Sequence, residues 1–313
     1  MEKIQVGISS CLLGNLVRYD GAHKYNSYIE QTLGQYFEFR SFCPEVASGM
    51  TIPRPPIQLQ QTAAGIRSIG VKDSNLDVTE KLEQISIQQH EWLKNLSAYI
   101  LKKDSPSCGM ERVKVYKNGI PARSGIGIFA DYLQKAFPNL PIEEEGRLGD
   151  PVLRENFIQR VFVMWRWQQL CLQDLTTHEL MIFHSRHKLI AMSHNQNIAK
   201  DLGRIIANIK PETLATDAQQ YISTLMGCLK TVATRGNHVN VLQHIQGYLK
   251  TSLDKEDKRE LSETIENYRK NEIPLIVPLT LLRHYFRKQP NDFIDASYYM
   301  LPHPGELSLL NEI

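Results

Sequence analysis

The first half of the chain alternates short apolar runs with segments of helical spacing. Strands are predicted over Ile4–Ser9, Phe37–Phe42 and 97–101, because each run is short, apolar or β-branched and is followed at once by turn residues. Residues 78–96 and 128–137 have the apolar spacing of amphipathic helices. This alternation of buried strands with helices predicts an α/β domain built on a mostly parallel sheet.

The pattern changes in the middle of the chain. Residues 138–151 contain two prolines, a run of three glutamates and a glycine-rich turn, a combination typical of a linker. Beyond this point strand signals almost vanish, and amphipathic helices follow one another at 153–171, 178–193, 213–231, 239–251 and 256–270. We therefore expect an α/β domain over residues 1–150 and an all-α helical bundle over residues 151–313.

Composition narrows the class of protein. A length of 313 residues favours two domains, and 42% hydrophobic with 22% charged residues is ordinary for a globular protein. No run approaches the roughly 20 apolar residues that span a bilayer, and the N-terminus lacks the pattern of a signal peptide. A cytoplasmic protein with no membrane role is expected. The net charge of +2 neither requires nor excludes nucleic acid as a partner.

Three of the five cysteines follow predicted strands. In a reducing cytoplasm, cysteines are interpreted as metal ligands, catalytic groups or core residues before disulfides. Cys11, Cys43 and Cys108 each lie in a turn framed by glycine or proline, and the carboxyl ends of parallel strands share one edge of a sheet. Structural zinc prefers four ligands, and the chain has no CxxC pair. Three thiolates suit a 4Fe–4S cluster with one exposed iron, although any one of these cysteines alone could be a core residue.

The remaining cysteines and one histidine pair carry weaker signals. Cys171 and Cys228 lie in apolar helical stretches and are expected in the core. His184 and His187 are spaced along one helix, but no carboxylate or cysteine partner is suggested nearby, so a packing or surface role is expected.

The cysteine segments resemble the TudS-like family, whose founding activity is the removal of sulfur from thiouracil with a 4Fe–4S cluster. The resemblance implies that Cys11, Cys43 and Cys108 hold the cluster and leave the fourth iron open for the substrate sulfur. It covers about residues 3–150 and rests on six motifs in order: Ser10-Cys11-Leu12-Leu13-Gly14, Arg18-Tyr19-Asp20-Gly21, Cys43-Pro44-Glu45, Pro53-Arg54-Pro55, Ser105-Pro106-Ser107-Cys108-Gly109 and Gly125-Ile126-Gly127.

The same resemblance implies catalytic roles for Glu45 and Ser105 beside the open iron. The implied reaction is hydrolytic and non-redox, with sulfur of a thiolated uracil replaced by oxygen from water. Glu45 could instead stabilise a helix start, Ser105 and Asp104 could be turn or capping residues, and Arg18 and Arg54 could form surface salt bridges. Further candidates for the substrate or cluster pocket are Ser10, Arg18, Asp20, Arg54, Asp104 and Ser107.

The second half resembles a domain of unknown function that is often fused behind a TudS-like domain. The resemblance rests on residues 183–188, 240–250, 273–280 and 299–310. Such fusions look like desulfidases that act on 4-thiouridine in tRNA, which implies that the helical half contacts RNA. Basic side chains neutralise phosphates, and the candidates for RNA binding are Arg186, Lys188, Arg235, Lys250, Arg283, Arg287 and Lys288.

Two alternatives stay open at this point. The chain could be a desulfidase of free thiouracil whose helical half serves dimerisation or regulation, which would make it a homo-oligomer. It could also be a non-catalytic iron–sulfur protein that binds RNA or senses redox state.

Overall fold

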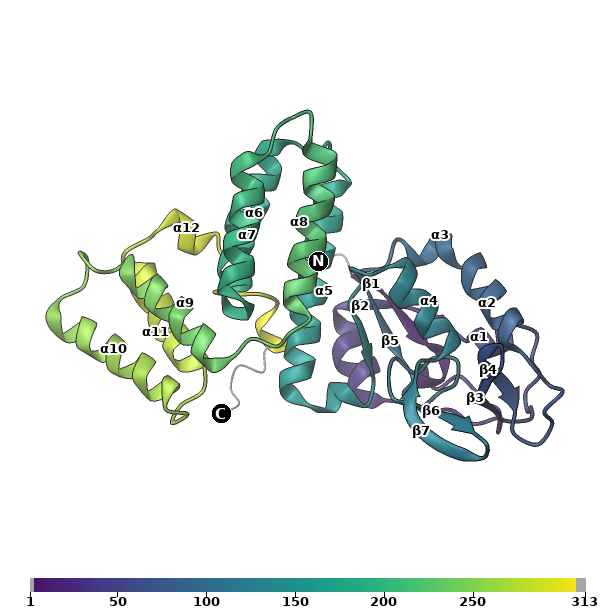
Figure 1. Cartoon of the computed structure of the whole chain (residues 1–313). Helices are drawn as coiled ribbons and strands as arrows, with labels where there is room; N and C mark the ends of the chain where they lie inside the picture. The colour runs from purple at the N-terminus through teal and green to yellow at the C-terminus, as the bar shows by residue number, and fades with distance from the viewer. Residues whose placement is uncertain (1–2, 308–313) are drawn as a thin grey trace. The chain divides into compact units, whose positions relative to one another are not determined.

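The computed structural model describes residues 3–307, and residues 308–310 of the motif at 299–310 lie outside them. The chain divides into two compact units, Met1–Asp150 and Pro151–Ile313 (Figure 1). The first unit is α/β with a parallel sheet and the second is helical, which confirms the predicted fold class. Within the described residues, no helix is long and apolar enough to cross a membrane.

The N-terminal unit is built around a four-stranded parallel sheet. Its strand order is β2 (Phe37–Phe42), β1 (Ile4–Ser9), β5 (Ala98–Leu101) and β8 (Ile142–Glu144). The central strands β1 and β5 are almost wholly buried, as predicted. β2 pairs on one side only and most of its residues are partly or fully exposed, so the prediction of a buried strand there is wrong.

Strand β8 occupies the segment that the sequence predicts to be a linker. The linker interpretation of the acidic run is wrong, because Glu143 and Glu144 lie in this strand and are buried. Arg147 Nε donates to Glu143 Oε1 at 2.6 Å, and the Met110 amide donates to Glu144 Oε1 at 2.7 Å. Specific partners therefore stabilise these carboxylates inside the unit, which composition alone does not reveal.

A second sheet of four strands was not predicted. Its order is β4 (Gly65–Gly70), β3 (Ile57–Thr62), β6 (Val113–Lys117) and β7 (Ile120–Gly125), with two antiparallel hairpins joined through the parallel pair β3 and β6. The turn between β6 and β7 is Asn118-Gly119, with φ of 51° and 79°. Because both residues of such a turn need positive φ, an Asn-Gly pair between short strands is a strong hairpin signal.

Helices cover the parallel sheet. The predicted helix at 78–96 divides into α2 (Thr79–Gln88) and α3 (His90–Leu93), and the one at 128–137 is α4 (Ile128–Ala136). α4 packs its Phe129 ring at 5.4 Å, centroid to centroid, from the ring of Tyr99 on β5. Short helices complete the unit: α1 (Pro44–Ala47), η1 (Ser10–Leu13), η2 (Tyr28–Thr32), η3 (Leu33–Gln35) and η4 (Arg147–Gly149).

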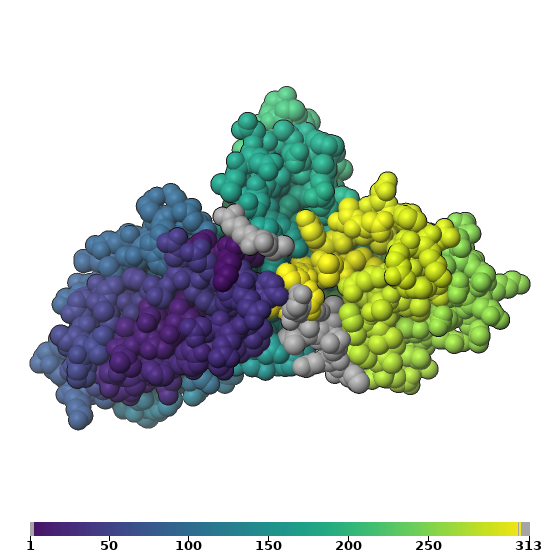
Figure 2. Space-filling view, turned by 180° about the vertical axis from the view of Figure 1, so that it is seen from behind, coloured from purple at the N-terminus to yellow at the C-terminus, as the bar shows by residue number. Residues whose placement is uncertain are grey.

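The Tyr99 ring extends over the neighbouring strand at Gly7. A Cβ atom on Gly7 would lie 2.2 Å from Cδ2 of Tyr99, so glycine leaves the space that the ring fills. Tyr99 is fully buried, and its hydroxyl has no hydrogen-bond partner among the described residues. The space-filling view shows part of this unit's surface in purple and blue (Figure 2).

The C-terminal unit is entirely helical in the described residues. Its helices mostly begin at a polar residue that accepts a hydrogen bond from a first-turn amide; Thr176, Asn195, Thr234, Asp254 and Asn291 do so. The helices are α5 (Pro151–Cys171), α6 (Thr177–His194), α7 (Gln196–Asn208), α8 (Leu214–Leu229), α9 (Arg235–Gly247), α10 (Lys255–Arg269), α11 (Ile276–Lys288) and α12 (Asp292–Asp295), followed by η5 (Gly305–Leu307).

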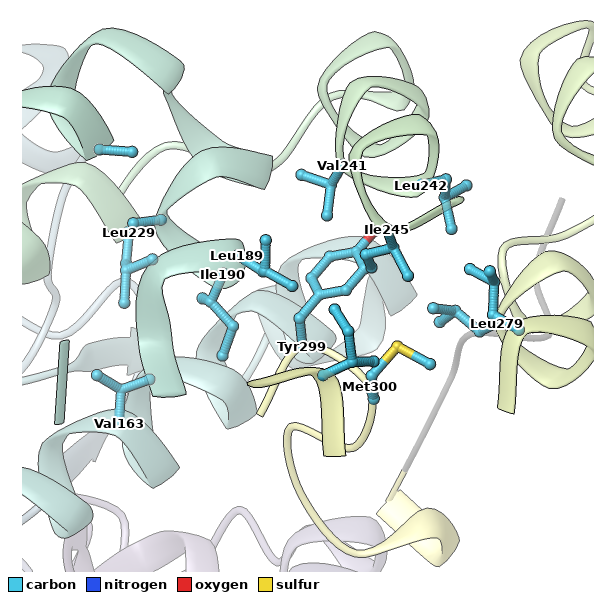
Figure 3. Packing of buried hydrophobic residues seen from close by; sticks show 14 of the residues in the cluster. Val163, Leu189, Ile190, Leu229, Val241, Leu242, Ile245, Leu279, Tyr299 and Met300 are labelled. Carbon is cyan, nitrogen blue, oxygen red and sulfur yellow. The ribbon is translucent and has the colours of Figure 1, made fainter. Parts of the chain in front are cut away.

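One hydrophobic core joins these helices. Figure 3 shows the Tyr299 ring between Leu189 of α6 and Ile245 of α9, with its hydroxyl oxygen directed toward α9. Cys228 is buried, as predicted. Cys171 is exposed, so its expected place in the core is wrong, because it is the last residue of α5.

The histidine pair on α6 has the predicted packing role. His187 is fully buried, and its Nδ1 lies 2.7 Å from the carbonyl oxygen of Phe183. Nδ1 of His184 lies 3.2 Å from the Tyr221 hydroxyl. Both rings are thus tied to neighbours within the helical core.

Candidate functional site

The thiols of Cys11, Cys43 and Cys108 line one cavity of about 440 Å³ in the N-terminal unit. Cys11 lies in η1 directly after β1, Cys43 joins β2 to α1, and Cys108 follows β5 by a short loop. Parallel strands bring their carboxyl ends to one edge, which is where open α/β sheets bind ligands. The topology therefore unites three soft sulfur ligands that are far apart in the sequence.

The loop that carries Cys108 is held by local hydrogen bonds and by close packing. The Ser105 hydroxyl accepts from the amides of Ser107 at 3.2 Å and Cys108 at 3.0 Å, as in a serine-centred turn. Gly127, which precedes α4, leaves no room for a side chain, because its Cβ would lie 2.5 Å from the carbonyl carbon of Ser107. The Ser105 hydroxyl thus has a structural partner, in addition to lining the cavity.

Burial raises the pKa of all three thiols. For Cys11 burial and the neighbouring Cys43 raise the pKa to about 11, against the opposing effect of Lys102 and Arg18. Burial raises the pKa of Cys108 well above its usual value, and the nearby Cys43 adds to this. For Cys43 burial raises the pKa, while the amides of Val46 and Glu45 lower it. Without a metal the thiols are protonated at neutral pH, so metal binding must release protons.

The Glu45 carboxylate lies on the wall of the same cavity. Arg54 donates to Glu45 Oε2 from Nη2 at 2.6 Å and from Nε at 2.9 Å. The Ser107 hydroxyl donates to Oε1 at 2.9 Å. Arg54 is further fixed by a hydrogen bond from Nη2 to the carbonyl oxygen of Val17 at 2.9 Å. Two residues from separate loops therefore fix the orientation of a carboxylate beside the thiols.

Of the other residues predicted for the pocket, some line the cavity and one does not. Ser10, Arg18 and Asp104 line the cavity. Asp20 lies outside the cavity lining, exposed, with Oδ1 3.4 Å from Arg18 Nε. Asp104 has a positive φ of 58° and pairs with Nη1 of Arg123 at 2.9 Å. The structure therefore brings Ser10 and Arg18 close to the sulfurs, while Asp20 acts on the cavity through Arg18.

Sequence reasoning missed the lysines of the cavity. Lys102 follows β5 directly, and its Nζ pairs with Glu145 Oε1 at 2.5 Å. The Ser9 hydroxyl accepts a hydrogen bond from the Lys102 amide at 3.0 Å. The position of Lys102 and Lys103 just after β5 is the signal that could have revealed these two residues. The basic residues that line the cavity are Arg18, Lys24, Arg54, Lys102 and Lys103, against the carboxylates of Glu45 and Asp104.

The donor set fits a cluster better than a single ion. Across residues 3–307, no group of three His, Cys, Asp or Glu side chains lies close enough to hold one metal ion. An iron–sulfur cluster is larger than a single ion and is held mainly by cysteine thiolates. Three thiols around one cavity, with an excess of basic side chains to balance thiolates and sulfides, satisfy these requirements.

The RNA candidates on the C-terminal unit fall into two groups. Arg235 donates from Nη1 to the Tyr268 carbonyl oxygen at 2.6 Å, and Arg283 donates to the Met300 carbonyl oxygen, so both make internal contacts. Lys188 is half-buried. The exposed candidates are Arg186, Lys250, Arg287 and Lys288.

Comparison with known proteins adds family information. Residues 6–145 match the family described as 2-thiouracil desulfurase, and residues 188–304 match DUF1722, a family of unknown function. The uncharacterized protein YbgA of Escherichia coli (strain K12) is 30% identical over 151 residues, 48% of this chain and 89% of YbgA. The uncharacterized protein YbbK of Bacillus subtilis (strain 168) is 34% identical over 109 residues, 33% of this chain and 71% of YbbK.

One solved structure is also similar. The [4Fe-4S]-dependent thiouracil desulfidase TudS is 30% identical, with a TM-score of 0.38, and the match covers 48% of this chain and 95% of that one.

Proposed function

We propose that this chain, which belongs to the 2-thiouracil desulfurase family through residues 6–145, is an iron–sulfur-dependent desulfidase that replaces sulfur by oxygen in 4-thiouridine of tRNA. The proposal depends on one observation. The wall of a single cavity contains Cys11, Cys43, Cys108 and Glu45. This is a set of soft ligands beside a proton acceptor, the combination that a hydrolytic desulfuration needs.

Cys11, Cys43 and Cys108 would hold a 4Fe–4S cluster. The absence of a fourth cysteine from the cavity lining, the basic side chains around it and the sequence identity to TudS support this group. When bound, the cluster supplies a Lewis-acidic iron for the thiocarbonyl sulfur. Since the thiols are protonated without metal, loading is expected to release protons and to be favoured at higher pH.

Glu45 would accept the proton of the attacking water. A carboxylate oxygen has two lone pairs, so Oε1 retains a site for that proton while it accepts from Ser107. Arg54 holds the other oxygen and keeps the carboxylate in one orientation. Water oxygen replaces sulfur on the pyrimidine carbon and sulfur leaves as hydrosulfide, so no electron is gained or lost.

The helical unit would bind the RNA that carries the thiolated base. The cavity and Glu45 lie wholly in the first unit, so a second unit of similar length points to a larger substrate. The exposed basic residues Arg186, Lys250, Arg287 and Lys288 are suited to phosphate contacts.

Isotope labelling tests the proposal. Anaerobically reconstituted protein is incubated with 4-thiouridine-containing tRNA in ¹⁸O water, and the nucleosides are analysed by mass spectrometry. We expect uridine that carries one labelled oxygen, with one sulfide released for each uridine formed. Unlabelled uridine would exclude hydrolysis, and conversion of free thiouracil without conversion of tRNA would assign the enzyme to the free base.

A further inference from the structure

A second cavity, of about 280 Å³, lies inside the C-terminal unit. It is formed where one face of α5 meets the end of α6, the loop before α9 and the helices α10 and α11. Leu275, Leu279, Val232 and Ala233 supply apolar wall, and Tyr268 and Tyr299 supply aromatic rings. Its volume is just below the range of roughly 300–1,000 Å³ for drug-sized ligands, so it suits a ligand of one or two rings.

Two carboxamides on α5 present acceptors at this cavity. Asn156 donates from Nδ2 to the Leu229 carbonyl oxygen at 3.1 Å, which leaves Oδ1 as an acceptor. Gln159 lies three residues further along the same helix face, with its Oε1 2.7 Å from Nε2 of His194. The protonation of the His194 ring nitrogens determines whether the oxygen or the NH2 group of the Gln159 carboxamide faces this ring.

The His194 ring fixes the orientation of Gln159. Nδ1 of His194 lies 2.6 Å from the carbonyl oxygen of Thr231, so Nδ1 carries the proton. Burial lowers the pKa of His194 to about 4, and the neutral ring therefore has a lone pair on Nε2. Two acceptors, Oε1 of Gln159 and the lone pair on Nε2, would then face each other, so the Gln159 carboxamide is assigned in the flipped orientation. Its NH2 group then donates to Nε2, and its carbonyl oxygen is left to accept from another donor.

A guanidinium and a second imidazole complete the polar part of the wall. The Arg235 guanidinium lies 4.5 Å from the centre of the Tyr268 ring, and its Nη1 donates to the Tyr268 carbonyl oxygen at 2.6 Å. Nδ1 of His238 lies 2.9 Å from the Tyr299 hydroxyl. Glu155, the carboxylate of the lining, is 2.5 Å from Nε2 of His303. The cavity thus offers uncharged donors and acceptors, one guanidinium, and one carboxylate that pairs with His303.

We propose that this cavity binds a single nucleobase. Aromatic and guanidinium groups stack on flat rings, and Asn and Gln carboxamides pair with base edges through one donor and one acceptor. A cation does not suit a wall that holds Arg235, and the cavity is too small for a dinucleotide. The inference rests on the RNA part of the proposed function, since it identifies how the helical unit engages its partner: through one base turned out of the strand.

Binding of sulfur-free probes tests the cavity separately from catalysis. The full-length protein is titrated with fluorescent single-stranded U6 RNA and with uridine, neither of which can be desulfurated. Ala233→Leu fills the cavity from a half-exposed loop position, and Ala233→Ser is the matched control of nearly unchanged volume. We expect Ala233→Leu to weaken binding at least tenfold and Ala233→Ser to bind like the wild type.

The outcomes answer two questions: whether the cavity binds a base, and whether that base belongs to RNA or to a free nucleoside. Weaker U6 binding in Ala233→Leu supports a base within RNA, and weaker uridine binding alone supports a free nucleoside. Unchanged binding of both probes overturns the proposal. Gln159→Leu provides a second variant that removes a base-edge acceptor, with at least a tenfold loss expected. Turnover of free thiouracil should be unchanged in all these variants. A wild-type protein that binds U6 but does not desulfurate thiolated tRNA would contradict the proposed function and leave the cavity assignment intact.

Discussion

Arg54 donates two hydrogen bonds to one oxygen of the Glu45 carboxylate, from Nη2 at 2.6 Å and from Nε at 2.9 Å. The side chain of Arg54 is 3% exposed and that of Glu45 14%, so solvent screens the pair little. Ser107 holds the other oxygen at 2.9 Å. The carboxylate therefore has one preferred orientation at the cavity wall.

Glu45→Gln should keep the iron content but lower turnover about a hundredfold, because the amide cannot accept the proton of water. The measurement is the rate of uridine formation per loaded cluster. Glu91→Gln is the control, since Glu91 is exposed, pairs with Lys94 and lies outside the cavity lining, and its rate should match the wild type. A wild-type rate in Glu45→Gln would show that Glu45 is a structural residue and not the proton acceptor.

Arg54→Ala should lower the free energy of unfolding of the N-terminal unit by about 3 kcal/mol, because it leaves the Glu45 carboxylate partly buried without its cation. Hydrogen exchange of the β1 amides reports the stability of this unit. Arg123→Ala removes a half-exposed pair with Asp104 and should cost about 0.5 kcal/mol or less. Equal effects of the two changes would contradict the importance assigned to the Glu45 pair.

Changing Cys11, Cys43 or Cys108 to Ala should abolish stable loading of about four irons and four sulfides after anaerobic reconstitution. Cys228→Ala and Cys171→Ala should load normally, because both residues lie in the helical unit. Iron, sulfide and zinc are measured together. Full loading of Cys108→Ala, or stoichiometric zinc in the wild type, would disprove the ligand assignment.

The helical unit should lose stability as the pH falls below about 6.5. Burial lowers the pKa of His194 to about 4 and those of His187 and His238 to about 3, from an ordinary 6.5. The unfolded chain therefore binds protons between pH 6.5 and about 4 while the folded unit does not. Each histidine should remove about 2 kcal/mol at pH 5.

Urea unfolding at pH 7 and pH 5 measures this loss. The Trp92→Phe variant confines tryptophan fluorescence to Trp165 and Trp167 of the helical unit. Stability that is independent of pH across this range would show that the three imidazoles are protonated in the folded protein.

Arg287→Ala with Lys288→Ala should weaken tRNA binding and reduce the slope of log K against log salt by about 1 to 2, because each lost phosphate contact releases about one counterion fewer. Arg204→Ala is the control, an exposed arginine that pairs with Asp201 on α7. Arg283→Ala is unsuitable for this test, since Arg283 bonds to the Met300 carbonyl oxygen and its loss affects folding. An unchanged slope would place the RNA surface elsewhere.

The parallel sheet and the meeting of the cysteines were predictable because both follow from strands of strong apolar pattern. Cys11 and Cys43 lie within two residues of the ends of β1 and β2, so the topology alone places them at one edge. The hairpin sheet was not predicted, since β7 is exposed along most of its length and lacks an apolar run. Its turn at Asn118-Gly119 was the available signal.

The strand β8 and the cavity of the helical unit show why the rest could not be predicted. Glu143 and Glu144 have polar side chains that the sequence pattern assigns to solvent, and only the tertiary partners Arg147 and Met110 make their burial favourable. Likewise, Asn156 and Gln159 are ordinary helix residues until α6 and α9 pack around them.

The contact between Gly7 and Tyr99 should restrict which residues can occupy these two positions together. A methyl group at position 7 would lie 2.2 Å from the Tyr99 ring, and phenylalanine at 99 would keep the same clash because only the hydroxyl is lost. A larger residue at 7 therefore requires a small one at 99 and a shift of the Leu96 side chain, whose Cδ1 would lie 2.7 Å from that methyl group. Among related chains we expect covariation between the two positions, with the aromatic ring at 99 present only where position 7 is glycine.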